Sequence, residues 1–260
     1  TNDEIIAMLN EGRTVKPKTF RFTIPEGYTI EKIADKLAAE GLIDKSAFLA
    51  LADSAEARGW SSAAASVPDD EKLLHPLEGY LFPETYEMEA GSTETDILKR
   101  MMVELDRKLA QLPEDWQDVL DERNMTLHEL LTIASLIERE VAVAEEQPIV
   151  ASVIYNRLKE GMPLQIDATV QYALGETKER VLEEDLEVDS PYNTYKIPAL
   201  PPGPIASPSL SAIRAALEPE ETDYLYYVTK KDGSRTHLFA RTFKEHQENI
   251  RKSNAAAAQG

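Results

Sequence analysis

Two glutamates, Glu138 and Glu140, lie in a stretch that is otherwise rich in Ile, Leu, Val and Ala, at residues 126–146. Apolar residues recur there at helical spacing on more than one face, which predicts a buried helix. Thr126 followed by Glu129 has the spacing of a capping box and marks the start of this helix. A carboxyl group among apolar neighbours is costly to ionise, and the raised pKa that results suits a general acid.

The spacing does not decide which of the two glutamates does chemistry. Residues two apart on a helix point to roughly opposite sides, so Glu138 and Glu140 do not form a paired-carboxylate site. The structural alternative is that one of them pairs with Arg139 or another cation. The other glutamate would then reach solvent at the helix end, as most acidic side chains on helices do.

The composition excludes several classes of protein. The chain has 260 residues, 42% of them apolar, which is enough for one large or two modest domains. The formal net charge of -19 argues against a nucleic-acid partner. Without cysteine, and with four histidines that lack metal-site spacing, the chain is expected to use neither a metal nor another cofactor. No apolar run reaches the length of a membrane span, and no signal peptide is visible.

The elements before the glutamates form a small unit with its own pattern. Residues 19–24 alternate like a strand, and residues 29–41 and 45–54 each have the pattern of a short helix. Residues 77–88 are expected to be an edge strand because they contain Pro83. Between these elements, the polar stretch 59–70 is expected to be an exposed loop.

This strand–helix–helix–strand order resembles a LysM-like module, a class that binds the N-acetyl sugars of peptidoglycan or chitin. The alternative is a small packing subdomain that binds nothing. We assign residues 16–90 to this LysM-like subdomain. Residues 1–12 repeat part of the 29–41 helical pattern, so we interpret residues 1–15 as the remnant of an upstream element.

The rest of the chain predicts a mainly helical catalytic domain at residues 91–252, followed by a flexible tail at 253–260. The fold class is therefore α+β. Residues 161–175 mix strand-like alternation with polar turns, and residues 176–189 are acidic and expected to be solvated. The remaining expected elements are helices at residues 93–111, 116–123, 148–161, 211–217 and 242–252, and a β-hairpin over residues 224–239.

A proline-rich loop at residues 190–208 follows the acidic stretch. Its six prolines exclude a regular element. It also carries Tyr192, Asn193, Thr194 and Tyr195, which are residue types that stack on sugars and hydrogen-bond to them. We expect this loop to form one wall of a glycan cleft, because long stiff loops are often functional. The alternative is a rigid loop that merely covers the core.

Seven short motifs, taken in order, resemble the catalytic domain of the endolytic murein transglycosylase (YceG-like) family from Leu131 to His246. The fragments are individually weak, but their order and spacing are specific. In that family Pro usually stands where this chain has Ala168. The motifs are Glu138-x-Glu140, Asn156-Arg157-Leu158, Gly161-Met162-x-Leu164-Gln165-x-Asp167, Tyr192-Asn193-Thr194-Tyr195, Leu200-Pro201-Pro202-Gly203-Pro204-Ile205, Tyr224-Leu225-Tyr226-Tyr227-Val228 and His237-x-Phe239.

The resemblance implies a catalytic role for Glu140, the second position of the Glu-x-Glu motif. It also implies substrate contacts from the other motif residues. It further implies an enzyme held in the cell membrane by a single N-terminal helix missing from this fragment, with its catalytic domain outside the cytoplasm. Such an enzyme would act with the cell-wall synthesis machinery. The residues carried over as substrate-binding are Gln165, Asp167, Tyr192, Asn193, Thr194 and Tyr195.

The implied reaction is endolytic cleavage of nascent peptidoglycan glycan strands between MurNAc and GlcNAc, which leaves 1,6-anhydro-MurNAc ends. A lytic transglycosylase needs one carboxyl group, because the C6 hydroxyl of the sugar attacks its own C1. Two alternatives stay open. One is a lysozyme-type hydrolase that uses Asp167 as a second carboxylate, and the other is a non-catalytic peptidoglycan-binding scaffold.

Overall fold

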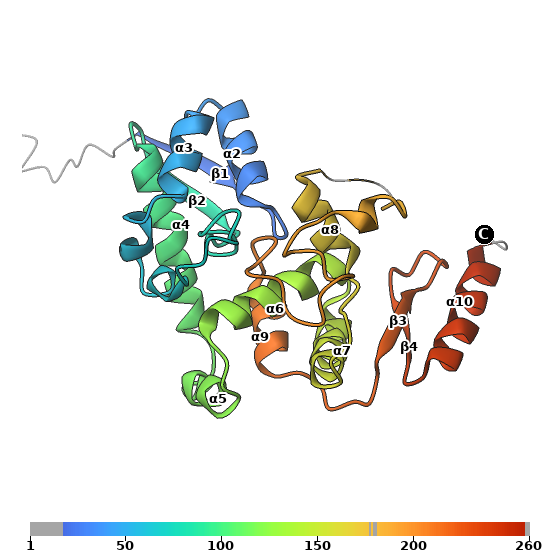
Figure 1. The fold of residues 1–260 in the computed structure, drawn as a ribbon. Helices are drawn as coiled ribbons and strands as arrows, with labels where there is room; N and C mark the ends of the chain where they lie inside the picture. Colours follow the sequence, from blue (N-terminus) through green and yellow to red (C-terminus); the bar gives the residue numbers. More distant parts are fainter. Residues whose placement is uncertain (1–17, 177, 179–180, 258–260) are drawn as a thin grey trace, which may run out of the picture.

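The helix that carries both glutamates, α6 (Leu127–Glu140), lies at the centre of the fold (Figure 1). In this computed structural model, which describes residues 18–176, 178 and 181–257, every α6 residue from 130 to 137 is buried. The expected capping box is confirmed: the Thr126 hydroxyl accepts from the Glu129 N–H, and the Glu129 carboxylate accepts from the Thr126 N–H at 2.8 Å. The α+β fold class is also confirmed.

The helix is shorter than the 126–146 stretch predicted. It ends at Glu140, and Val141 is extended (φ -116°, ψ 115°). Val141 and Val143 have β-branched side chains, which are less favourable in helices than Leu or Ala. A 3-10 turn (Ala144–Glu146) then leads into α7 (Gln147–Lys159), which has the expected proline in its first turn. The early end places Glu140 at the last turn of α6.

The N-terminal unit has the expected strand–helix–helix–strand order. Strand β1 (Thr19–Thr23) pairs antiparallel with β2 (Thr85–Glu89), and the helices α2 (Ile30–Ala39) and α3 (Lys45–Ala52) lie between them in sequence. The pair Phe22 and Tyr86 is buried and stacked at a centroid distance of 5.2 Å. The LysM-like identity of this unit stays a prediction, and the helix predicted at residues 1–12 lies outside the described residues.

Two expectations within this unit are wrong. The 59–70 stretch is not simply an exposed loop, because it overlaps two 3-10 turns (Ala57–Trp60 and Ala64–Ser66), and Ala57, Ala63 and Ala64 are buried. Small alanine side chains let this segment pack closely against α4 (Glu94–Leu109). The predicted 77–88 strand forms only after Pro83, and the preceding residues are irregular and buried.

Helix α4 also packs against α3, so elements on both sides of the predicted boundary at residue 90 share contacts (Figure 1). The boundary itself stays a prediction. A short helix, α5 (Trp116–Glu122), connects α4 to the central helix. Helices α7, α8 (Asp167–Leu174) and α9 (Leu210–Leu217) pack against α6. In the described part of the chain, no helix has the length and apolar character needed to cross a lipid bilayer.

Helix α8 corrects the strand-like pattern expected at residues 161–175. The helix begins at Asp167 and ends at Gly175, which is left-handed (φ 68°) and closes it as a glycine C-cap does. Its buried residues Ala168, Thr169 and Val170 are adjacent in sequence, so the apparent alternation did not report a sheet. The acidic stretch that follows contains a 3-10 turn (Asp185–Glu187), and Asp185 is buried and paired with Lys178 rather than solvated.

The C-terminal layer is the expected hairpin, formed by β3 (Tyr226–Thr229) and β4 (His237–Ala240), and it packs against α10 (Phe243–Ala257). The helix continues beyond the expected end at residue 252. Ser253, in the predicted flexible tail, is buried, and its hydroxyl donates to the Thr229 carbonyl at 2.7 Å. This contact fixes the last turns of α10 on the hairpin.

The proline-rich loop has no regular element, as predicted, but its second half is buried and joins the N-terminal unit to α6. Ser207 exchanges backbone hydrogen bonds with the β1–α2 turn, from Gly27 N–H at 2.9 Å and to the Tyr28 carbonyl at 2.8 Å. The Ile205 N–H donates to the Ser135 hydroxyl of α6 at 3.0 Å. The second half of the loop, residues 200–208, therefore connects the N-terminal unit to α6 from inside the fold.

Substitution of Gly79 tests how tightly the second half of this loop is packed. Its backbone is left-handed (φ +81°), and an added Cβ would lie 2.5 Å from the Cβ of Pro204. We expect Gly79→Ala to lower the free energy of unfolding by about 2–4 kcal/mol, because backbone strain and overpacking add. Gly41 is the matched control, with φ +71° and nothing within 4 Å. Gly41→Ala should lose about 1 kcal/mol in urea denaturation, and equal losses for both variants would contradict this packing.

Candidate functional site

Glu140 meets the C-terminal hairpin at the last turn of α6. Its side chain is half-buried, and its Oε2 accepts a hydrogen bond from the Tyr227 hydroxyl on β3 at 2.8 Å. The glutamate is therefore fixed by one phenol, and part of it still reaches the surface. A group that must exchange protons with a bound substrate needs both properties.

The electrostatic setting of Glu140 raises its pKa above the ordinary value of a glutamate, as the sequence predicted. Burial is the largest cause, and the nearby Asp167 carboxylate adds to it. The Tyr227 hydrogen bond opposes this shift, as do His237 and Arg139. Desolvation exceeds these favourable contacts, so Glu140 holds its proton to higher pH than a free side chain does.

Glu138 points to the other side of α6 and has a different role. Its Oε2 accepts from both the backbone N–H and the hydroxyl of Ser209, at 3.0 Å and 2.5 Å. Ser209 is the N-cap of α9, so this carboxylate lies at the positive end of a helix dipole. Glu138 therefore fixes the start of α9 on α6.

Two of the predicted substrate-binding residues lie near Glu140, namely Asp167 and Tyr195, and a third, Gln165, comes two residues before Asp167. Asp167 begins α8 with an exposed side chain, and the Tyr195 hydroxyl donates to its Oδ1 at 2.5 Å. Tyr195 is half-buried, and Glu140 is close enough to affect its pKa, which burial raises first. Gln165 is exposed on a left-handed backbone (φ 54°), and its Oε1 accepts from Arg157 at 3.4 Å.

The other three predicted contacts, Tyr192, Asn193 and Thr194, are fully buried, so their side chains do not face a cleft in this structure. The Asn193 amide donates to the carbonyls of Leu186 and Val188 at 2.8 and 2.9 Å. This part of the loop therefore corrects our expectation of direct sugar contact and fits the covering-loop alternative.

Thr194 and Tyr192 fix the loop from the inside. The Thr194 hydroxyl accepts from the Ile166 N–H at 3.0 Å and bonds to the Thr169 hydroxyl at 2.9 Å. The Tyr192 ring packs on Tyr172 of α8 with ring centroids 4.9 Å apart. Thr194 therefore positions the start of α8, and with it Asp167, and Tyr192 packs on the last turn of the same helix.

Several motif residues that the resemblance carried over only as substrate contacts instead support the site through contacts within the protein. The Arg157 guanidinium donates to the carbonyls of Leu225, at 2.7 Å, and Leu164, at 2.8 Å, and so ties α7 to the hairpin and to the segment before α8. His237 packs edge-on against Tyr227, with ring centroids 5.4 Å apart, and its Nδ1 is 2.7 Å from Glu146. The aromatic Tyr-Leu-Tyr-Tyr run was the available signal, but its alternation did not say which ring faces α6.

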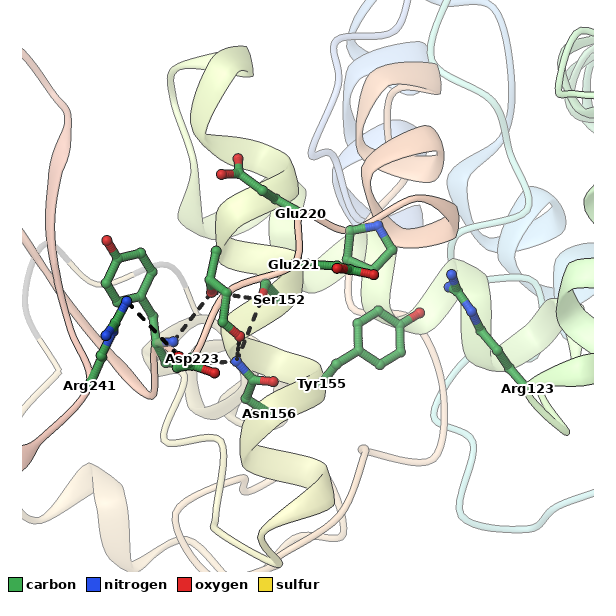
Figure 2. A pocket seen from close by; sticks show the side chains of 11 residues that line it. Arg123, Ser152, Tyr155, Asn156, Glu220, Glu221, Asp223 and Arg241 are labelled. Atoms are coloured by element: carbon green, nitrogen blue, oxygen red, sulfur yellow. Dashed lines mark hydrogen bonds and ion pairs between the residues drawn. The ribbon is translucent and has the colours of Figure 1, made fainter.

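A hollow of about 750 Å³ lies away from Glu140, beside the segment that precedes β3 (Figure 2). Several of its polar groups are already engaged: the Asn156 amide donates to the carbonyls of Thr222 and Tyr224, and Arg123 donates to the Leu217 carbonyl. These contacts anchor the hairpin to α7. Among the residues that the structure describes, no group of three or more acidic or histidine side chains is arranged to hold a metal ion.

The fold and site define an α+β protein with a partly desolvated glutamic acid at the end of its central helix. The chain belongs to the YceG-like family, whose sequence profile matches residues 1–252. A crystal structure of a YceG-like protein from Listeria monocytogenes is similar, with 38% identity and a TM-score of 0.78, over 95% of this chain and 81% of that one.

Two relatives carry the name endolytic murein transglycosylase. The Bacillus subtilis protein is 40% identical over 94% of this chain and 67% of its own length. The protein from Streptococcus pneumoniae strain D39 is 33% identical over 96% of this chain and 48% of its own length. The chain thus spans about half to two thirds of these relatives.

Substitution of Tyr192 distinguishes between two interpretations of the proline-rich loop, as a cover for the core or as a binding surface. We expect Tyr192→Ala to lower the free energy of unfolding by about 3–5 kcal/mol, because it empties a fully buried aromatic site. Tyr195→Ala, in the same loop but half-buried, should lose much less. Urea denaturation of both variants gives the comparison, and a stable Tyr192→Ala protein would restore the binding-loop interpretation.

Replacement of Glu140 tests its raised pKa through stability. A carboxyl group with a raised folded pKa favours folding at low pH. That contribution is lost as pH rises from the pKa of the group in the unfolded chain, about 4.3, through its higher pKa in the folded protein. Glu140→Gln removes this dependence. Relative to wild type, the variant should therefore gain stability between acidic and neutral pH.

Thermal unfolding at both pH values measures the effect. Glu138→Gln is the matched control on the same helix, and it should lose about 1 kcal/mol at neutral pH because it weakens two charge-assisted hydrogen bonds to Ser209. A Glu140→Gln protein less stable than wild type at neutral pH would mean that Glu140 is an ionised structural carboxylate.

Proposed function

We propose that this chain is an endolytic lytic transglycosylase, a lyase that cleaves nascent peptidoglycan glycan strands between MurNAc and GlcNAc. The observation that carries the proposal is Glu140, a half-buried carboxyl group with a raised pKa and one phenol donor at the end of α6. The names of the relatives supply the substrate class.

In the proposed reaction, protonated Glu140 donates its proton to the glycosidic oxygen as the bond to C1 breaks. Positive charge develops at C1, and the C6 hydroxyl of the same muramic acid attacks it. The ionised Glu140 then takes the proton of that hydroxyl. The new bond closes a 1,6-anhydro ring, no water is consumed, and the carboxyl group returns to its starting state.

Neighbouring residues have supporting roles in this proposal. The Tyr227 hydroxyl donates to the carboxylate form of Glu140, so it stabilises the state between the two proton transfers. Asp167, oriented by Tyr195, supplies negative charge beside Glu140 and so favours positive charge near C1. Gln165 is exposed beside this pair and would contact the sugars.

A hydrolase that uses Asp167 as second carboxylate is the competing reaction. The hydrogen bond from Tyr195 restrains Asp167, which suits a fixed electrostatic group better than a nucleophile. The products discriminate between the two, because hydrolysis adds the mass of one water per cleaved bond, at the muramic acid end, and transglycosylation adds none. A scaffold that only binds glycan would give no product.

Further proposals concern the whole protein. An anchor in the membrane through an N-terminal helix, a catalytic domain outside the cytoplasm and association with the cell-wall synthesis machinery follow from the resemblance. They fit an enzyme that terminates glycan strands as these are made. The N-terminal unit, with its LysM-like order of elements, would bind the strand.

Activity of two variants tests the proposed roles on purified peptidoglycan, with products identified by mass spectrometry. Glu140→Gln should lower kcat by about 100- to 10,000-fold, because Gln cannot supply a proton. Tyr227→Phe should keep part of the activity. It removes a hydrogen bond that holds down the pKa of Glu140, so the loss of activity at high pH should move to higher pH.

Glu87→Gln is a control for a carboxylate exchange on an exposed strand far along the chain, where Glu87 pairs with Arg21. Anhydro products from wild type, together with this order of variants, support the proposal. Hydrated ends would favour the hydrolase, and a fully active Glu140→Gln enzyme would place the acid elsewhere.

A further inference from the structure

A cavity of about 530 Å³ lies between α2 of the N-terminal unit and α8 of the catalytic half, close to the candidate site. Two residues of the cavity wall are next to site residues in the chain: Arg139 precedes Glu140, and Ala168 follows Asp167. The Arg139 charge also acts on the pKa of Glu140, so a ligand at Glu140 would lie near this cavity.

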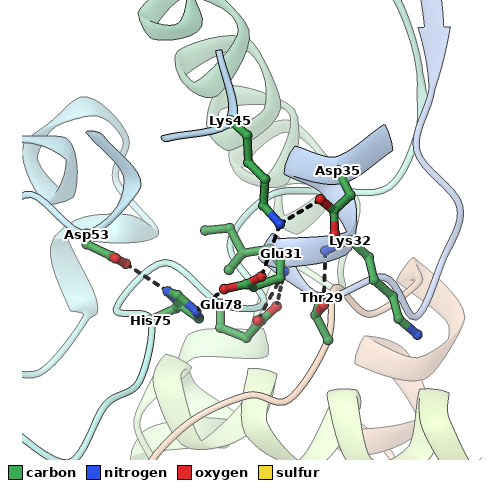
Figure 3. A network of polar contacts seen from close by, with 9 residues as sticks. Thr29, Glu31, Lys32, Asp35, Lys45, Asp53, His75 and Glu78 are labelled. Carbon is green, nitrogen blue, oxygen red and sulfur yellow. Dashed lines mark hydrogen bonds and ion pairs between the residues drawn. The ribbon is translucent and has the colours of Figure 1, made fainter. Parts of the chain in front are cut away.

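The acidic side chains in the cavity wall already have partners. Both oxygens of the buried Glu78 accept from the Ile30 N–H at 3.1 Å. Lys45 pairs with Asp35 at 2.6 Å and with Glu31 at 3.4 Å, and Figure 3 shows this network on the α2 side. The negative charges of the wall are thus largely compensated within the protein.

Two cations of the wall are not matched in this way. Lys32 points away from the carboxylate network in Figure 3, and no described carboxylate lies within ion-pair distance of its amine. The Arg139 guanidinium donates to the Gly27 carbonyl at 3.2 Å and likewise has no ion-pair partner among the described residues. Burial lowers the pKa of Lys32, and the nearby Arg139 lowers it further, so the two charges interact.

Such a pair is unusual in a chain with a net charge of -19, because carboxylates are abundant and could neutralise it. Neighbouring cations repel each other, and an anionic ligand would relieve that repulsion. The rest of the wall includes apolar side chains, namely Leu74, Ala168, Ala173, Leu174 and Ile205. This combination fits a short peptide with small side chains and free carboxylates.

We infer that this cavity binds the peptide stem of the glycan strand, with Lys32 and Arg139 contacting its carboxylate groups. The inference rests on the proposed function, which supplies the substrate: its muramic acid carries both the scissile bond and the stem. The N-terminal unit would then recognise the peptide beside the reaction centre through α2, and catalysis would favour strands that still carry stems.

The test compares kcat/KM on stem-bearing strands with kcat/KM on the same strands after an amidase has removed the stems. Wild type should have the higher kcat/KM on the stem-bearing substrate. Lys32→Gln should lower the ratio of the two kcat/KM values, stem-bearing over stem-free, about tenfold, as expected for one lost charge-assisted hydrogen bond. Lys32→Glu should lower it further. The control is Lys36→Gln, one turn along α2, where Lys36 pairs with Glu40 at 2.6 Å.

A lowered ratio in both Lys32 variants but not in Lys36→Gln supports the inference. An equal preference in wild type, or a ratio that Lys32→Glu leaves intact, overturns it. Affinities of Glu140→Gln protein for the two substrates, with and without Lys32→Gln, separate this from the proposed function. If wild type turned over neither substrate, the proposed function would fail, and a stem-dependent affinity that requires Lys32 would still uphold the cavity.

Discussion

The desolvation of Glu140 is the constraint on which the candidate site depends. The half-buried carboxyl group at the end of α6 loses part of its hydration, and the Tyr227 hydroxyl restores one donor. That hydrogen bond also joins the C-terminal hairpin to the central helix. Arg157 ties α7 to the same hairpin, and the edge of the His237 ring supports Tyr227. The hairpin is therefore positioned by the contacts that set the state of the acid.

The N-terminal unit is joined to the rest of the chain by polar contacts as well as by packing. Within the unit, the buried Glu78 accepts from the start of α2, and burial raises its pKa to about 7. Close by, Gly79 lies against Pro204. The next residue, Tyr80, forms a hydrogen bond to Nδ1 of His128 on α6 at 2.8 Å. These contacts lie side by side in sequence, so one short segment couples the two halves of the molecule.

Local patterns gave reliable predictions where one signal dominated. The capping box at Thr126, the paired strands and helices of the N-terminal unit and the hairpin before α10 all follow from caps, turns and periodicity. Predictions failed where a weak pattern had two interpretations. The segment that forms α8 contains residues suited to either element, and its left-handed Gly175 decided in favour of a helix. Ser253 was placed in a tail because its single buried contact, to Thr229, is not visible in sequence.

The sequence by itself determined the buried helix, its two glutamates, the α+β class and the order of motifs that the family shares. It could not choose between Glu138 and Glu140, because helical periodicity says only that they face apart. The tertiary structure places Ser209 against the first and Tyr227 against the second, from segments about 70 and 87 residues away. It also buried Tyr192, Asn193 and Thr194, because whether a polar side chain in a loop turns inward depends on which distant backbone groups need partners.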